Sequence, residues 1–330
     1  MGCDYKKSLK RCSWVDASRV LAMLVVVLYH LPSSAMPAVE PGSLAQFVLR
    51  VFNGPGVSLA LFFVLAGYFT GYKFELNKWL VRLLSLFVPY VIWNLFCTFG
   101  LTDEITFSRI FGVGSEEGLC ADYPLWFIRD VFFITLLQPL WRYFPCTFFI
   151  FCIGCLCVLG DNAPSVFLEN IPIPEFYVFC LFMGGVLLSR ITLQTLQSYS
   201  NIWFPCSILL AVISFFLWSH APILYNIFGA CVILGFFSII EKICFPITLF
   251  LSKMSHACFL TYASHAGMII VIGKLLQKND LCDNLCAVYI PLAVAIYAVN
   301  VGAYYAIKRF LPVLLPFVAH EGKLLNLNRK

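Results

Sequence analysis

Charged residues are scarce in this chain. Only 12% of its 330 residues are Asp, Glu, Lys or Arg, whereas 61% are hydrophobic and the mean hydropathy is +0.88. A soluble domain carries roughly twice that share of charged residues. The shortage excludes an ordinary soluble enzyme. Apolar runs that recur from end to end instead favour an all-α, polytopic membrane protein.

Several signatures of catalysis and binding are also missing. The sequence has no Gly-rich phosphate loop, no zinc-ligand spacing and no nucleophile elbow. Its fifteen cysteines lie mostly within apolar runs, where a thiol is a small, weakly polar side chain. We therefore expect no metal and no tightly bound cofactor. The net charge of +5 does not indicate nucleic-acid binding, because its distribution along the chain has a simpler explanation.

The apolar runs predict about ten membrane-spanning helices in one domain that covers residues 1–330. Short tails of about 1–13 and 310–330 would flank this helical bundle, and the fifth and sixth spans are the shortest. The expected spans are 14–31, 47–72, 79–100, 124–144, 146–160, 176–190, 203–219, 223–240, 257–276 and 284–307.

The distribution of Lys and Arg predicts the orientation in the membrane. With the N-terminus in the cytoplasm, 16 of the 22 basic residues fall in cytoplasmic segments and four on the outer side. This bias places both termini in the cytoplasm. A cleavable signal peptide is the alternative for the N-terminus, with a cleavage site at Ser33 to Ala35. However, Asp16, Arg19 and His30 are unusual residues for such a peptide.

Two polar side chains interrupt the first apolar run. Arg19 and His30 are 30 − 19 = 11 residues apart, so on a helix they share one face at roughly 16 Å along the axis. Such residues inside a span usually have a function. An imidazole is a suitable base near neutral pH. The alternatives are that Arg19 extends to the headgroups and that His30 is an interfacial polar residue. Asp16 could pair with Arg19 at the i, i+3 spacing, which is compatible with either role.

Five further positions carry polar groups in or beside the later spans. Arg129 and Asp130, adjacent in the fourth predicted span, could line a polar cavity or form a structural ion pair. Arg82, at the start of the third, could be a membrane anchor or a clamp for phosphate groups, and Lys78 could share that role. His265, inside the ninth, could belong to the site or be a hydrogen-bonded histidine of the bundle.

Five segments, in order along the chain, resemble the membrane-bound acyltransferase 3 family. Trp14 to His30 resembles the opening helix of that family, with its Asp, Arg and His. The other segments are Gly56 to Tyr68, Lys78 to Trp93, Leu125 to Arg129 with Trp126, and Ser252 to His265. Two departures are Ala66, where the family usually has Ser, and Ser85, where it often has a second Arg.

The resemblance implies transfer of an acyl group, usually acetyl from cytosolic acetyl-CoA, to a hydroxyl of a surface polysaccharide or its lipid-linked precursor. The membrane would be a bacterial inner membrane, and acyl-CoA would be a donor substrate rather than a bound cofactor. A homo-oligomer is left open. We interpret His30 and Arg19 as catalytic. The predicted substrate-binding residues are Asp16, Lys78, Arg82, Trp126, Arg129, Asp130 and His265.

Two other functions stay open at this stage. A transporter or flippase would use Arg19, Arg129 and His30 to line a solute path, although the sequence shows no duplicated halves. A regulator that kept the fold and lost the activity would fit the changes at Ala66 and Ser85. Consumption of acyl-CoA distinguishes an enzyme from a transporter.

Overall fold

The computed structural model describes residues 12–32, 38–101, 125–141, 176–216, 222–278 and 288–318. These residues form helices joined by turns, and no strand occurs among them. The prediction of an all-α fold is therefore confirmed. The fifth predicted span, 146–160, lies outside the described residues.

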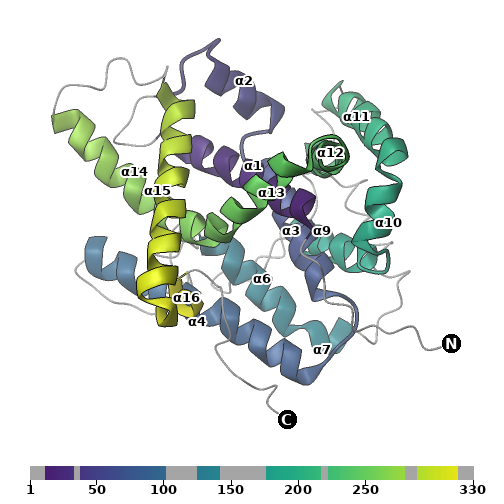
Figure 1. Cartoon of the computed structure of the whole chain (residues 1–330), viewed down its shortest axis with the longest axis horizontal. Coiled ribbons are helices and arrows are strands. Elements are labelled where there is room, and N and C mark those ends of the chain that lie inside the picture. The colour runs from purple at the N-terminus through teal and green to yellow at the C-terminus, as the bar shows by residue number, and fades with distance from the viewer. Residues whose placement is uncertain are drawn as a thin grey trace.

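Helix α1 (Ser13–His30) lies in the centre of the fold (Figure 1). In this helix 72% of the residues of the apolar window are buried, whereas the share is 28–39% in the other four helices that are long enough to cross a membrane. Its small and branched side chains allow close packing on every side. The helices around it are α3 (Gly56–Thr70), α12 (Pro222–Ile243), α13 (Phe245–Met254), α14 (Cys258–Lys278) and α15 (Tyr289–Phe310).

The second predicted span, 47–72, is a bent pair of helices. Helix α2 (Leu44–Val51) precedes α3, and the two axes differ by 44°. Between them, Asn53 and Gly54 have φ angles of 51° and 59°, in the left-handed region that ends a helix. The Asn53 amide donates a hydrogen bond to Oδ1 of Asn226 at 2.9 Å, which ties the bend to α12.

Two glycines allow α3 to pack against α9 (Phe176–Leu188) backbone to backbone. A methyl group at Gly67 would overlap the carbonyl oxygen of Phe182, and a methyl group at Gly185 would overlap that of Val64. Membrane helices associate through such small residues because close backbones increase van der Waals contact.

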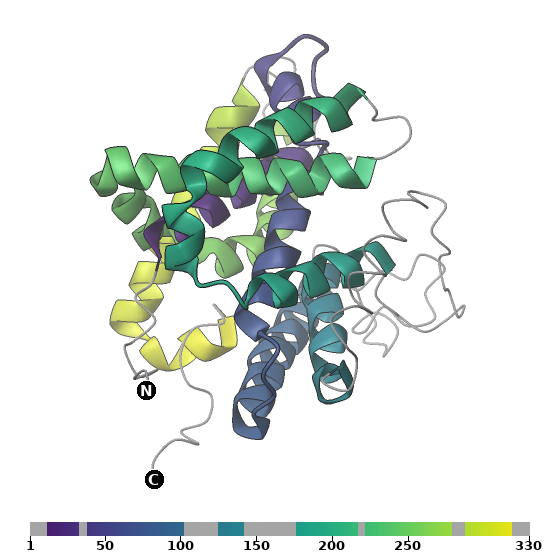
Figure 2. The ribbon, with the colours of Figure 1, turned by 90° about the vertical axis from the view of Figure 1, so that its right-hand side faces the viewer.

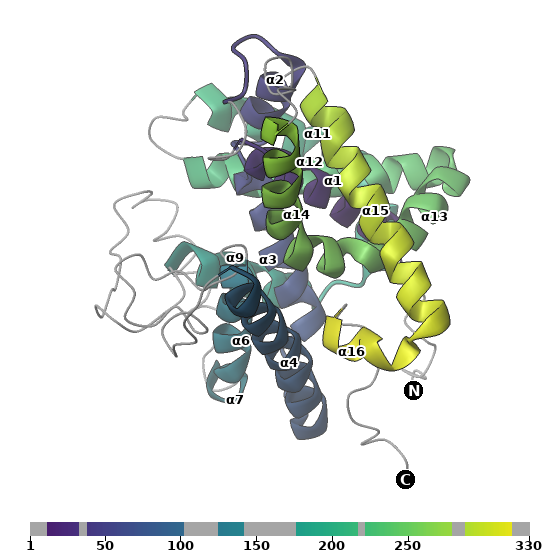
Figure 3. The same ribbon diagram turned by 90° about the vertical axis from the view of Figure 1, so that its left-hand side faces the viewer.

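Helices α4 (Leu76–Leu101) and α6 (Trp126–Leu136) lie side by side at one end of the molecule (Figures 2 and 3). The indole of Trp79 donates a hydrogen bond to the Thr135 carbonyl at 2.9 Å and fixes the pair. The short α7 (Gln138–Trp141) follows α6, so the fourth predicted span is an interrupted helix.

The chain after α15 also packs on α4. The 3-10 helix η5 (Pro312–Leu314) leads into α16 (Leu315–Val318), and the indole of Trp93 donates a hydrogen bond to the Val318 carbonyl at 3.1 Å. Part of the segment 310–330, expected to be a tail, is therefore structured.

Two further helices were not anticipated. The short α10 (Leu193–Ser198) precedes α11 (Ser200–Phe216), which lies beside α12 (Figure 2). Helix α13 precedes the ninth predicted span and joins α14 through the 3-10 turn η3 (Ser255–Ala257). Both α10 and α13 lie between predicted spans.

Five helices of the described chain are long and apolar enough to cross a membrane, and a sixth span is added if α2 and α3 count as one. Helices α9 and α11 are apolar but shorter. The structure supports an integral membrane protein, whereas ten spans and cytoplasmic termini stay predictions. The five long spans are Ser13–His30, Leu76–Cys97, Ile223–Ile243, Phe245–Leu276 and Tyr289–Phe310.

Candidate active site

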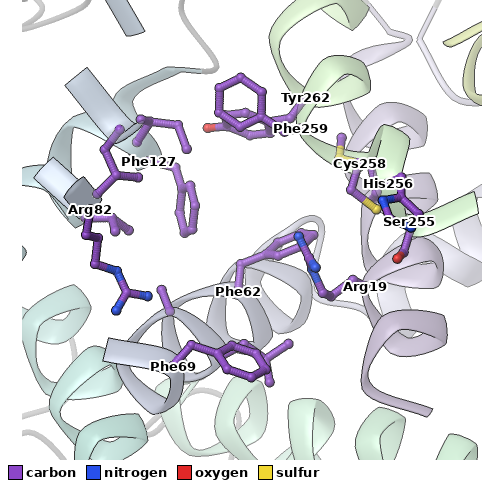
Figure 4. Close-up of a pocket in the computed structure, with 16 residues that line it drawn as sticks. Arg19, Phe62, Phe69, Arg82, Phe127, Ser255, His256, Cys258, Phe259 and Tyr262 are labelled. Atoms are coloured by element: carbon purple, nitrogen blue, oxygen red, sulfur yellow. The ribbon is translucent and has the colours of Figure 1, made fainter. Parts of the chain in front are cut away.

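A cavity of about 360 Å³ lies where α1, α3, α4, α6 and α14 converge (Figure 4). Its wall is mostly apolar and aromatic, as in sites that enclose part of a small-molecule ligand. Arg19 and Arg82 reach it from opposite sides. The apolar wall includes Met23, Phe62, Leu65, Phe69, Leu86, Phe127, Ile128, Val131, Phe259 and Tyr262.

The two arginines differ in their partners. Nη1 of Arg19 lies 3.4 Å from Oδ1 of Asp16, which confirms the predicted i, i+3 pair. Arg82, one turn into α4, has no ionic partner in the part of the chain that the structure describes. A guanidinium that faces an apolar cavity without a counterion favours an anionic ligand there.

Asp16 is held in place from a second helix. The hydroxyl of Ser252, on α13, donates a hydrogen bond to Oδ2 of Asp16 at 3.0 Å, and both side chains are buried. Asp16 therefore has one oxygen for Ser252 and the other for Arg19. This arrangement directs the Arg19 side chain toward the cavity.

His30 and His265 lie together, beyond the cavity. Their ring centroids are 5.2 Å apart, with planes inclined at 52°. His265 is 0% exposed, and its Nδ1 lies 2.8 Å from the Tyr262 carbonyl oxygen and 3.1 Å from that of Thr261. Neither histidine lines the cavity, but Tyr262 does, and its ring is 6.1 Å from that of His265. His265 is therefore one helical turn along α14 from the cavity wall, and His30 lies against it.

The charges of the fourth predicted span form an ion pair. Nε of Arg129 lies 3.2 Å from Oδ1 of Asp130, and the Asp130 side chain is only 3% exposed. Neither residue lines the cavity, although their neighbour Phe127 does. Trp126 packs against Phe63, at 6.1 Å between ring centroids. Of the two alternatives for Arg129 and Asp130, the structure shows the ion pair.

Lys78 points away from the cavity. Its Nζ lies 2.7 Å from Oε1 of Glu75, and the Lys78 side chain is 74% exposed. Lys78 is in the first turn of α4, whereas Arg82 is one turn deeper. The structure therefore separates the two cations that the sequence analysis had grouped.

The residues that sequence reasoning missed are mainly aromatic. Phe62, Phe127, Phe259 and Tyr262 form much of the wall. All four lie in segments that resemble the acyltransferase 3 family, but their residue type alone does not distinguish them among 33 Phe and 15 Tyr. His256 also lines the cavity and stacks on Tyr304. The sequence did contain a signal here, because Ser255 and His256 lie in the segment Ser252 to His265 that resembles the acyltransferase 3 family.

The polar groups at the cavity are cationic or neutral. Besides the two arginines, Ser255, His256 and Cys258 line it. Within the described ranges, no three His, Cys, Asp or Glu side chains are grouped as metal ligands would be. The site therefore has groups for an anion and an imidazole base nearby.

Comparison with known protein families shows which family the chain belongs to. A family model described as an acyltransferase domain, that of the acyltransferase 3 family, matches residues 13–319. This chain belongs to the acyltransferase 3 family. No curated protein and no solved structure matches it. With its apolar helices, this acyltransferase 3 member is a membrane acyltransferase, and the cavity with the adjacent histidines is its candidate active site.

Proposed function

We propose that this protein moves an acyl group, acetyl from cytosolic acetyl-CoA, to a hydroxyl of a surface polysaccharide or its lipid-linked precursor. The setting would be a bacterial inner membrane. The observation that carries the proposal is an apolar cavity with Arg19 and Arg82 on opposite sides, and with His265 one helical turn from its wall and in contact with His30.

The arginines suit the phosphate groups of the donor. Arg binds phosphate oxygens through two parallel N–H donors, and Arg82 has no competing ionic partner among the described residues. At about 360 Å³ the cavity takes only part of an acyl-CoA. We assign it to the pantetheine arm, which would lie along Phe62, Phe127 and Tyr262 and leave the nucleotide outside.

The spacing along α1 matches the length of that arm. Arg19 and His30 are roughly 16 Å apart along the helix axis. The pantetheine arm is a chain of about a dozen bonds and spans on the order of 15 Å when extended. A phosphate at Arg19 is therefore compatible with a thioester near His30.

His30 would act as the general base. The acceptor hydroxyl gives its proton to His30 while its oxygen forms a bond to the thioester carbonyl carbon. The carbon–sulfur bond then breaks, and the proton passes from His30 to the departing CoA thiolate. A positioned base of this kind contributes roughly 10²- to 10⁴-fold in rate.

Labelled acetyl-CoA tests this function directly. Membranes with wild-type protein should transfer the acetyl label to cell glycans, and an equally expressed His30→Ala variant should lose the transfer. His320→Ala, which changes a histidine outside the described residues, is the matched control and should transfer normally. Equal transfer by wild type and His30→Ala would remove His30 from the chemistry. Absence of transfer with acceptor present would contradict acetyl-CoA as donor.

A further inference from the structure

The surroundings of His265 determine which of its nitrogens carries the proton. Nδ1 lies within hydrogen-bond distance of the carbonyl oxygens of Thr261 and Tyr262, at 3.1 and 2.8 Å. A carbonyl oxygen only accepts, so Nδ1 must donate. In the neutral ring, Nε2 then has a lone pair and is an acceptor.

Nε2 of His265 has no partner of its own. It is buried and makes no hydrogen bond within the described part of the chain. Leaving such an atom unsatisfied is unfavourable, and most buried polar atoms find a donor. The adjacent polar group is the His30 ring, whose centroid lies 5.2 Å away.

The separation of the two rings suits a hydrogen bond between them. When one imidazole N–H points at the nitrogen of another, the ring centroids are roughly 5 Å apart. A rotation of the His30 ring would therefore direct its N–H onto Nε2 without movement of either helix. His30 is partly exposed and His265 is 0% exposed, so His30 is the more accessible of the two imidazoles.

We propose that His265 is a positioning residue, which accepts a hydrogen bond from His30 and holds it as the base for acyl transfer. This inference rests on the proposed function. With the N–H of His30 directed at Nε2 of His265, the other His30 nitrogen is the acceptor that takes the proton of the substrate hydroxyl. The chemical steps are unchanged: His30 takes the proton of the hydroxyl and later gives it to the CoA thiolate. His265 keeps its own proton throughout.

Two substitutions at His265 separate positioning from packing. In His265→Leu the acceptor is lost, so kcat should fall about 10- to 100-fold, while KM for acetyl-CoA should change less than about twofold. In His265→Gln the side-chain carbonyl can reach the place of Nε2, so kcat should recover at least about tenfold relative to His265→Leu. Full activity of His265→Leu, equal kcat for Leu and Gln, or a loss confined to KM would overturn the proposal.

Ser264→Ala controls for the loss of a partly buried hydrogen bond on the same helix. The Ser264 hydroxyl donates to Oδ1 of Asn300 at 2.7 Å, away from the histidine pair. This variant should keep the wild-type kcat. A loss equal to that of His265→Leu would mean that α14 merely needs its polar contacts.

Nitrogen NMR of the histidines gives a readout that does not need activity. The protein has five histidines, and the His265 signals are assigned by their absence from His265→Leu. The expected spectrum shows His265 protonated at Nδ1 with a hydrogen-bonded Nε2, and His30 signals that shift in the Leu variant. Protonation of His265 at Nε2 would overturn the proposal. If these spectra are as expected but no acyl transfer occurs, only the proposed function fails.

Discussion

Arg82 and Arg19 face the same cavity, but only Arg19 has an acidic partner among the described residues. Asp16 offsets the charge of Arg19 and fixes its direction, whereas Arg82 has no ionic partner among the described residues. Removal of a hydrogen bond between charged groups lowers the stability of a complex by about 1.5–3 kcal/mol. Each change of about 1.4 kcal/mol is tenfold in affinity. The unpaired arginine should therefore contribute most to donor binding.

For Arg82→Ala we expect KM for acetyl-CoA to rise about 10- to 100-fold, with kcat nearly unchanged, because the phosphate contact is the same in the ground state and the transition state. The KM of Arg82→Lys should lie between those of wild type and Arg82→Ala, since Lys keeps the charge and loses the paired donors. Steady-state kinetics with detergent-solubilised protein measure both constants. Arg309→Ala, an exposed cation at the end of α15, is the control. An unchanged KM in Arg82→Ala would remove Arg82 from the donor site.

Asp16→Asn should raise KM for acetyl-CoA by about tenfold, because Arg19 loses the carboxylate that directs it into the cavity. The matched control is Glu75→Gln, which breaks an ion pair of the same i, i+3 spacing on the exposed start of α4. Exposed pairs contribute little, so this control should behave as wild type. Equal effects of the two variants would contradict a specific role of Asp16.

The sequence predicted the polar residues of the site better than it predicted the aromatic residues that line the cavity. Arg19, Arg82, His30 and His265 stand out because a charged or titratable group is unfavourable in an apolar run. The aromatic wall lies in segments that resemble the family, but residue type did not predict it, because an aromatic side chain such as Tyr262 looks the same in sequence whether it faces lipid or a cavity. The contact of His30 with His265 also depends on how α1 and α14 pack, which no local pattern encodes.

Among the elements, α3 has the tightest contact described above. Gly67 and Gly185 bring its backbone against that of α9, and the bend at Asn53 and Gly54 aligns it with α12. The cavity residues Phe62, Leu65 and Phe69 are on this helix. The position of α3 therefore determines the shape of the cavity.

Gly67→Ala should destabilise the protein by about 1–3 kcal/mol, because the added methyl group cannot fit against the Phe182 carbonyl without movement of the backbone. The melting temperature in detergent should fall by several degrees. Gly267→Ala is the control, since nothing lies within 4 Å of a methyl group at that position of α14. There the gain in helix propensity should leave stability equal or slightly higher. An unchanged melting temperature for Gly67→Ala would contradict the packing described here.

The apolar runs of the sequence predicted where helices lie, but they did not predict where a helix bends or is interrupted. The bend between α2 and α3 depends on left-handed backbone at Asn53 and Gly54, and Asn-Gly alone does not say whether a span ends or bends. Helix α13 lies between two predicted spans and was not expected, and its Ser252 is buried against Asp16. Tertiary contacts overrode the local pattern in both places.

For the whole molecule, the central feature is a buried α1 that contributes to both parts of the site. Arg19 of α1 lines the cavity, and His30 at its other end contacts His265. Because helices from both halves of the chain surround α1, neither half alone contains the cavity. The charge bias along the sequence predicts that the Arg19 end is cytosolic.

That orientation predicts that both termini are in the cytoplasm. A reporter that fluoresces only inside the cell should be fluorescent when fused to either end, and an enzyme reporter active only outside should be inactive at both. An outside-active reporter at the C-terminus alone would show an odd number of spans. Activity at both ends would invert the predicted orientation.

The most direct test of the account is the ratio of free CoA released to acyl ester formed by purified protein, given acetyl-CoA and a glycan acceptor. We predict one CoA for each ester, with both falling together in His30→Ala. Passage of a solute with no CoA release would contradict the account and favour a transporter. Release of CoA in equal amounts by wild type and His30→Ala would contradict the role of His30 as the base.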